Sequence, residues 1–178
     1  MAIELAEYDP SWPEQGARAC AELTDAMPGL FLEAEHVGST SVPGVTAKPV
    51  IDIMVSVAGL DEVTAEREAV LERLGYRQQS TGMPGRLFYR RDADAVRLGH
   101  NLHIVTAETW DTRNERLFRD HLRAHPETAA EYSALKRHVV REEDDGLAYT
   151  KRKTELIQRV VDRERAARGL PLVPVWEE

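Results

Sequence analysis

A short polar loop followed by a lone carboxylate carries the residue types best suited to chemistry in this chain. Gly38 precedes three hydroxyl side chains, Ser39, Thr40 and Ser41, and Asp52 lies on the apolar stretch that follows. A loop of this composition can present backbone N–H groups and hydroxyls to an anion. A carboxylate among so many aliphatic residues is rarely placed there for packing. The pattern predicts an anion-binding loop beside a functional acid.

The same residues also have a purely structural interpretation. The hydroxyls of Ser39, Thr40 and Ser41 could cap a short helical turn. Asp52 could accept hydrogen bonds from the Ser39 loop and fix its shape. One carboxylate on a strand does not make a metal site by itself, so both interpretations stay open at this point.

The stretch from Glu35 to Val55 resembles the signature of the GrpB (UPF0157) family, within the nucleotidyltransferase-fold superfamily. In that superfamily a Gly-Ser pair ends one strand, and two acids separated by an apolar residue lie on the next. Gly38-Ser39 matches the pair and Asp52 matches the first acid, but residue 54 is Met54. Because methionine cannot coordinate Mg²⁺, the chain departs from the pattern of two-metal catalysis.

Two later stretches extend the resemblance over most of the chain. Asn101 and His103 share one face of a predicted strand, and the resemblance implies that His103 could replace the superfamily's third acid as a ligand or general base. Tyr149 and Lys153 lie one helical turn apart and resemble the family's Tyr-Thr-x-x-Lys element, where they would contact an anion. The alternatives are a hydrogen-bonded sheet histidine and an ordinary surface start of a helix.

The resemblance implies a metal-assisted nucleotidyl transfer. Asp52 would hold Mg²⁺ or Mn²⁺, the Gly38–Ser41 loop would hold the phosphates of a nucleotide or related compound, and Lys48 or Lys153 would offset their charge. A rival interpretation is a non-catalytic binding or folding-helper module, since domains of this family occur fused to dephospho-CoA kinase, and Met54 favours it. A third is altered chemistry on a phosphate-bearing small molecule, with His103 as the base.

Other candidate residues have weaker support. Glu35 could add a carboxylate near Asp52 only if both side chains point to the same face, and His36 could order the loop. His121 and His125 have the spacing of two helical metal ligands, but neither a following glutamate nor a third ligand is evident, which favours structural roles.

Composition narrows the classes of function. The chain has 178 residues and a formal net charge of −8, which argues against broad adhesion to nucleic acid or membranes. Its single cysteine, Cys20, cannot form an internal disulfide and suits a reducing compartment. Because no apolar run could span a membrane and no basic, apolar leader begins the sequence, we expect a cytoplasmic protein. The expected partner is a small phosphate-bearing molecule, with a homodimer possible.

The periodicity of apolar residues predicts the elements that must position these side chains. Three strands are expected in one sheet, at Phe31–Val37, Pro49–Val57 and Leu98–Thr106, and the segment from Trp110 to Arg168 is expected to be mainly helical. Further elements are a helix after Ser11, a helix over Asp61–Leu74 and strands at Tyr76–Gln79 and Leu87–Arg91. The prediction is a single α+β domain: a nucleotidyltransferase-like mixed sheet with flanking helices (about 10–108), a C-terminal helical group (109–168) and an apolar tail (169–178).

Overall fold

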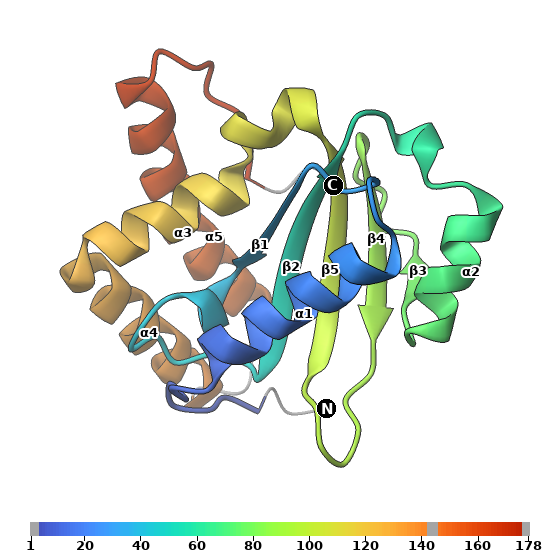
Figure 1. The fold of residues 1–178 in the computed structure, drawn as a ribbon. Coiled ribbons are helices and arrows are strands. Elements are labelled where there is room, and N and C mark those ends of the chain that lie inside the picture. The colour runs from blue at the N-terminus through green and yellow to red at the C-terminus, as the bar shows by residue number, and fades with distance from the viewer. Residues whose placement is uncertain (1–3, 142–145, 176–178) are drawn as a thin grey trace.

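The computed structural model describes residues 4–141 and 146–175, and the side chains of 139–150 are not described. A five-stranded mixed sheet forms its centre, in the order β1-β2-β5-β4-β3 (Figure 1). The central strands β2 and β5 pair in parallel, and the other neighbours pair antiparallel. The strands are β1 (Glu33–Val37), β2 (Val50–Val57), β3 (Arg77–Gln79), β4 (Arg86–Arg91) and β5 (Gly99–Thr106). The three strands predicted in one sheet are therefore confirmed as neighbours, and the fold is α+β.

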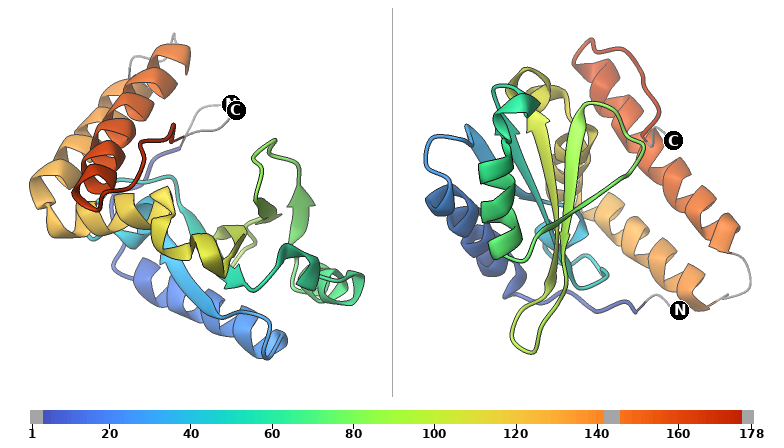
Figure 2. Two further views of the ribbon diagram at one scale, coloured as in Figure 1. Left: turned by 90° about the horizontal axis from the view of Figure 1, so that it is seen from above. Right: turned by 90° about the vertical axis from the view of Figure 1, so that its right-hand side faces the viewer.

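Helices cover the two faces of this sheet differently, as Figure 2 shows. One face packs on α1 (Trp12–Ala26) and α2 (Ala65–Arg73) through the main apolar core, which includes Ile51, Ile53, Leu102 and Ile104. The opposite side belongs to the C-terminal group, α3 (Asn114–Ala124), α4 (Pro126–Arg141) and α5 (Gly146–Ala167). These helices have an apolar cluster of their own, which includes Leu122, Tyr132 and Val160.

Several element boundaries differ from the sequence prediction. The helix expected over Asp61–Leu74 divides into a 3-10 turn (Leu60–Glu62) and α2, because Thr64 adopts an extended conformation at the N-cap of α2. The last helix begins at Gly146 rather than near Tyr149. The acidic segment at 142–146 predicts a break before this helix, and most of it lies outside the described residues.

The apolar tail after α5 packs on its own chain. The side chain of Gln158 donates to the carbonyl of Val173 (2.9 Å) and accepts the backbone N–H of Val175 (3.0 Å). Arg165 Nε donates to the carbonyl of Pro171 at 2.6 Å. Within residues 4–141 and 146–175, no helix has both the length and the apolar character needed to cross a membrane.

Candidate functional site

A cavity of about 350 Å³ lies between the sheet and the C-terminal helices. Because β2 and β5 run in parallel with Asp52 opposite Asn101 and Met54 opposite His103, the polar residues of both strands fall on one face. The lining combines ionisable, polar and aromatic side chains: Gly38, Ser39, Asp52, Arg86, Phe88, Asn101, His103, Asn114, Glu115, Phe118, Tyr132 and Lys153, with the apolar residues Val37, Met83, Ile157 and Val175. The structure therefore brings Asp52, Asn101, His103, Lys153 and the start of the loop together.

Asp52 is held between a hydrogen-bond donor and a glycine backbone. Asn101 Nδ2 donates to Asp52 Oδ1 at 2.9 Å. Gly38 has φ +74°, and a Cβ atom at this position would lie 2.4 Å from Asp52 Oδ2, so only glycine satisfies both the conformation and the space. Burial raises the pKa of Asp52 to about 6, against the opposing effects of Asn101, Lys153 and Lys136. A carboxyl with this pKa changes charge close to neutral pH.

Only one of the three loop hydroxyls lines the cavity. Ser39 lines it, whereas Thr40 and Ser41 are almost fully buried elsewhere. Ser41 Oγ donates to the carbonyl of Gly38 (2.5 Å). Thr40 Oγ1 donates to the carbonyl of Val50 (3.1 Å) and accepts from His36 Nε2 (2.8 Å). The hydroxyls of Thr40 and Ser41 thus shape the loop, and Ser39 is the hydroxyl residue of the loop that lines the cavity.

Two lysines from different helices meet beside Ser39 and Asp52. Lys153 of α5 lines the cavity and makes no hydrogen bond to the part of the chain that the structure describes. Lys136 of α4 is buried, and its Nζ donates to Ser39 Oγ (2.5 Å) and to the carbonyl of Thr46 (3.0 Å). Burial lowers the pKa of both amines, to about 7 for Lys136.

Sequence reasoning did not select Lys136. It lies one helical turn after the buried Tyr132, and the two side chains pack together, with Nζ 4.1 Å from the ring centroid. A lysine on the apolar stripe of a helix is a signal that could have identified it, because lysines are rarely buried without a partner.

His103 belongs to a half-buried chain of polar side chains with Arg86 and Glu115. Arg86 Nη1 donates to His103 Nδ1 (3.2 Å) and to Glu115 Oε1 (2.5 Å). Burial, together with the Arg86 guanidinium, lowers the pKa of His103 to about 4, which leaves the ring neutral at pH 7. Since Nδ1 accepts from Arg86, the other ring nitrogen carries the proton. This arrangement favours a hydrogen-bond donor at His103 over a general base.

The position of the missing second acid is filled by apolar packing. Met54 is fully buried in a small cluster with Val37, Val105 and Trp110. Glu35 points to the same face of the sheet, since it lies opposite Met54 in the β1–β2 register. Its carboxylate, however, accepts hydrogen bonds from two arginines of α3.

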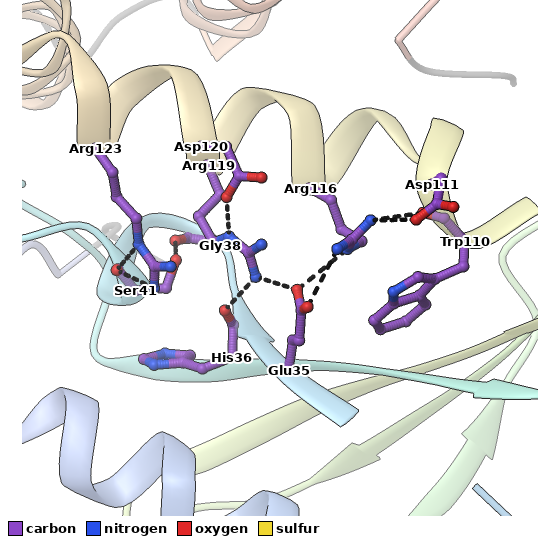
Figure 3. Close-up of polar contacts among 10 residues, drawn as sticks. All are labelled: Glu35, His36, Gly38, Ser41, Trp110, Asp111, Arg116, Arg119, Asp120 and Arg123. Atoms are coloured by element: carbon purple, nitrogen blue, oxygen red, sulfur yellow. Dashed lines mark hydrogen bonds and ion pairs between the residues drawn. The ribbon is translucent and has the colours of Figure 1, made fainter. Parts of the chain in front are cut away.

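Arginines of α3 hold Glu35 and the loop, as Figure 3 shows. Arg116 makes two hydrogen bonds to the Glu35 carboxylate (3.1 and 3.2 Å), and Arg119 Nη1 makes a third (2.6 Å). Although burial opposes ionisation, these arginines keep the pKa of Glu35 below its usual value. Arg119 also donates to the carbonyl of His36, and Arg123 donates twice to that of Ser41 (3.0 and 2.9 Å). The loop backbone is thereby fixed to α3.

The donor set around Asp52 limits how a divalent cation could bind. Among the described residues, no group of three or more His, Cys, Asp or Glu side chains is arranged to hold a metal ion. Met54 is apolar, and Glu35 is neutralised by two arginines. Asp52 fits a cation that arrives with its own phosphate and water ligands, because Mg²⁺ commonly uses one or two carboxylates plus substrate oxygens. It does not fit a cation held by protein ligands alone.

Other predicted residues lie outside this cluster. Lys48 is exposed and is not part of the cavity lining. Tyr149 belongs to α5, but its side chain lies outside the described part of the chain. His121 Nδ1 meets Glu164 Oε1 at 2.6 Å, and its ring stacks on His125 with 4.0 Å between centroids, as expected of structural roles.

Comparison with known proteins finds relatives that match this chain over most of its length. The profile of the family described as "GrpB protein" matches residues 2–163. A UPF0157 protein of Halalkalibacterium halodurans is 34% identical over 93% of this chain and 84% of that protein. The crystal structure of the conserved protein GrpB from Enterococcus faecalis superposes with a TM-score of 0.79 at 29% identity, over 93% of this chain and 99% of that chain.

More distant matches include part of a larger protein and a structure of similar fold. A dephospho-CoA kinase of Mycolicibacterium paratuberculosis is 32% identical over 76% of this chain, which spans 39% of that protein. The Cid1 poly(U) polymerase bound to Mg and 3′-dATP has a TM-score of 0.53 at 12% identity, over 74% of this chain and 42% of that one. At this identity the second likeness concerns the fold, which is that of the nucleotidyltransferases.

Proposed function

The chain belongs to the GrpB family, and from this membership we propose that it binds a nucleotide or a related phosphate-bearing small molecule in the cavity above β2 and β5. The observation that carries the proposal is the Lys153 ammonium, which faces the cavity without a hydrogen-bond partner among the described residues. Lys153 is half-buried, and a partly desolvated cation without a hydrogen-bond partner is stabilised by an anion. The neighbouring Lys136 and Ser39 place further donors on the same side.

The remaining lining suits the rest of a nucleotide. Phe88, Phe118 and Tyr132 offer aromatic surfaces on which a base can stack, and Asn101 and His103 offer polar groups. A cavity of about 350 Å³ is within the range of small-molecule sites, roughly 300–1,000 Å³. The nucleotide named for the poly(U) polymerase supports the same class of ligand, because the two chains share a fold.

Mg²⁺ or Mn²⁺ is part of this proposal only as an ion that accompanies the phosphates. Asp52 would be its protein ligand, and the ion would supply charge neutralisation at the phosphate oxygens when bound. Asn101 orients the carboxylate through its hydrogen bond to Oδ1. Lys153, which lines the cavity, would hold the phosphates, and the α3 arginines would keep the loop in place. The reaction that we propose for this site is the transfer of a nucleotidyl group to an acceptor.

Calorimetric titration with ATP and UTP, with and without Mg²⁺, tests the proposal. Lys153→Met should weaken binding about tenfold to a hundredfold, since hydrogen bonds to charged groups contribute roughly 1.5–3 kcal/mol. Lys48→Met is the matched control, because Lys48 is exposed and outside the cavity. Equal losses in both variants, or no heat of binding with the wild-type protein, would contradict the proposal.

A non-catalytic module is the second candidate, and Met54 favours it. Its side chain leaves a single accessible carboxylate where the superfamily pattern has two. The match to part of a dephospho-CoA kinase is consistent with a domain that assists another protein. Nucleotide binding without release of pyrophosphate, under conditions that offer alcohol and amine acceptors, would favour this candidate.

A further inference from the structure

Ser39 and Lys136 form a pair whose geometry goes beyond phosphate binding. Ser39 Oγ lies 2.5 Å from Lys136 Nζ, and Ser39 is one of the residues that line the cavity. Lys136 is only 4% exposed, so water does not compete for its amine. A nucleophilic hydroxyl and a base within hydrogen-bond reach, next to a ligand cavity, are the first two parts of an activated nucleophile.

A third group orients the amine. The carbonyl of Thr46 accepts a hydrogen bond from Lys136 Nζ at 3.0 Å. The N–H of the same residue donates to Ser133 Oγ at 3.1 Å. Ser133 and Lys136 are three residues apart on α4 and so share a helix face. Helix α4 therefore holds Thr46 at both backbone groups, which fixes the carbonyl that directs the amine.

We propose that Lys136 acts as a general base that turns the Ser39 hydroxyl into a nucleophile toward the phosphorus of a phosphoanhydride or activated phosphoester. In its neutral form the amine donates one N–H to Thr46 and accepts the hydroxyl proton of Ser39 with its lone pair. Serine–lysine pairs of this kind occur on unrelated folds. The choice of a phosphorus substrate rests on the proposed function, whereas the nucleophilicity of Ser39 does not.

The proposed reaction is a single displacement at phosphorus. The Ser39 Oγ–P bond forms as the bond from phosphorus to its leaving oxygen breaks, and the hydroxyl proton passes to Lys136 Nζ. The leaving phosphate or alcohol departs with the electron pair of the broken bond, and a phosphoserine ester remains on the protein. Lys153, which lines the same cavity, stabilises the negative charge on the non-bridging oxygens.

The charges around Lys136 set the pH at which the pair would work. Burial and the Lys153 charge lower the pKa of Lys136 to about 7, while Asp52 acts to raise it. The Tyr132 ring, 4.1 Å from Nζ, also favours the charged form. The base is therefore protonated at pH 5.5 and largely neutral above pH 8, and the reactivity of Ser39 should rise between these values.

A fluorophosphonate probe tests the nucleophile without requiring nucleotide binding. Its P–F bond breaks as Oγ–P forms, so a reactive serine acquires one stable adduct that intact mass and peptide mapping detect. We expect a single adduct at Ser39 in the 178-residue protein, abolished by Ser39→Ala and retained by Ser80→Ala, which changes an exposed serine. Lys136→Met should slow labelling at least tenfold.

Lys136→Arg separates a base from a positioning group. Arginine can keep the charge and the hydrogen bond to Ser39 but cannot accept the proton, so it should not restore labelling. Restoration by arginine, or a labelling rate of the wild-type protein that is flat from pH 5.5 to 8.5, would overturn the proposal. The pH profile remains decisive if the Lys136 variants fail to fold. Labelling without nucleotide binding would refute the proposed function alone, and nucleotide binding without labelling would refute this inference alone.

Discussion

The two faces of β2 and β5 use alternate residues of the same strands for different purposes. On the face that packs on α1 and α2, Ile51, Ile53 and Leu102 are fully buried in the apolar core. On the opposite face, Asp52 and Asn101 line a cavity and bond to each other. Successive residues of one strand thus alternate between the apolar core and the cavity.

The difference shows how a polar site can be built inside a stable sheet. The α1–α2 face supplies the apolar burial that drives folding, at roughly 25 cal/mol per Å². The α3–α5 face joins the sheet largely through charged hydrogen bonds, such as those of Arg116 and Arg119 to Glu35. Substitutions on the first face should therefore change stability, and those on the second should change binding, except where apolar packing extends into it.

Met54→Asp should give the largest effect on stability. Met54 lies on the face of the sheet that carries Asp52, yet it is fully buried in an apolar cluster. The new carboxylate would be buried among Val37, Val105 and Trp110, which offer it no partner. We expect a loss of roughly 3–5 kcal/mol in the free energy of unfolding. Urea denaturation measures it, with Met54→Leu as the volume-matched control costing less than about 1.5 kcal/mol. A Met54→Asp protein that remains stable and binds Mg²⁺ more strongly would contradict this expectation. It would indicate that the new carboxylate and Asp52 form the acid pair of the superfamily.

Leu102→Ala tests the core face next to the site. Leu102 is fully buried and adjacent in sequence to Asn101. Removing its side chain should cost about 3 kcal/mol of stability, within the usual range for buried leucines. ATP affinity measured by calorimetry well below the melting temperature should stay unchanged. A parallel loss of affinity would show that the two faces are not independent.

Asp52→Asn should stabilise the protein at neutral pH. The folded-state pKa of about 6 exceeds the unfolded value near 3.8, so the ionised form of Asp52 costs stability as pH rises between these values. The neutral amide avoids this cost and keeps an acceptor for Asn101. We expect a gain of about 3 kcal/mol at pH 7 that is mostly lost by pH 4. Thermal melts at both pH values measure it, and a lower melting temperature at pH 7 would show that the carboxylate charge holds the loop.

Arg123→Ala should give the smallest effect. The substitution removes two hydrogen bonds to the carbonyl of Ser41 and frees one contact between α3 and the loop. A loss of about 1 kcal/mol in stability is expected, with a few-fold weaker affinity for ATP. Arg159→Ala, which removes an exposed pair with Glu131, is the control and should change neither quantity measurably.

The sequence predicted the parts of the site that depend on local pattern. Alternation on adjacent strands places Asp52 and Asn101 on one face, and the glycine of the loop precedes Ser39, so these residues could be found without coordinates. Arg86 and Glu115 could not, because their place depends on how β4 and α3 pack on the sheet. Lys136 was missed although its position on the apolar stripe of α4 is visible in the sequence, and only the packing of α4 shows that it meets Ser39. The packing of Met54 was missed for the same reason, since Trp110, which lies in a 3-10 segment between β5 and α3, closes its cluster.

The parallel pairing of β2 with β5 has a consequence for the kinetics of folding. The hydrogen bond between Asn101 and Asp52 joins residues 49 positions apart, and no local turn can bring them together. Closing such a loop costs entropy before any contact repays it, so pairings of this kind form slowly. A chain still emerging from the ribosome would carry its Asp52 unpaired until β5 had been synthesised. The acid would then gain its partner in the step that completes the centre of the sheet.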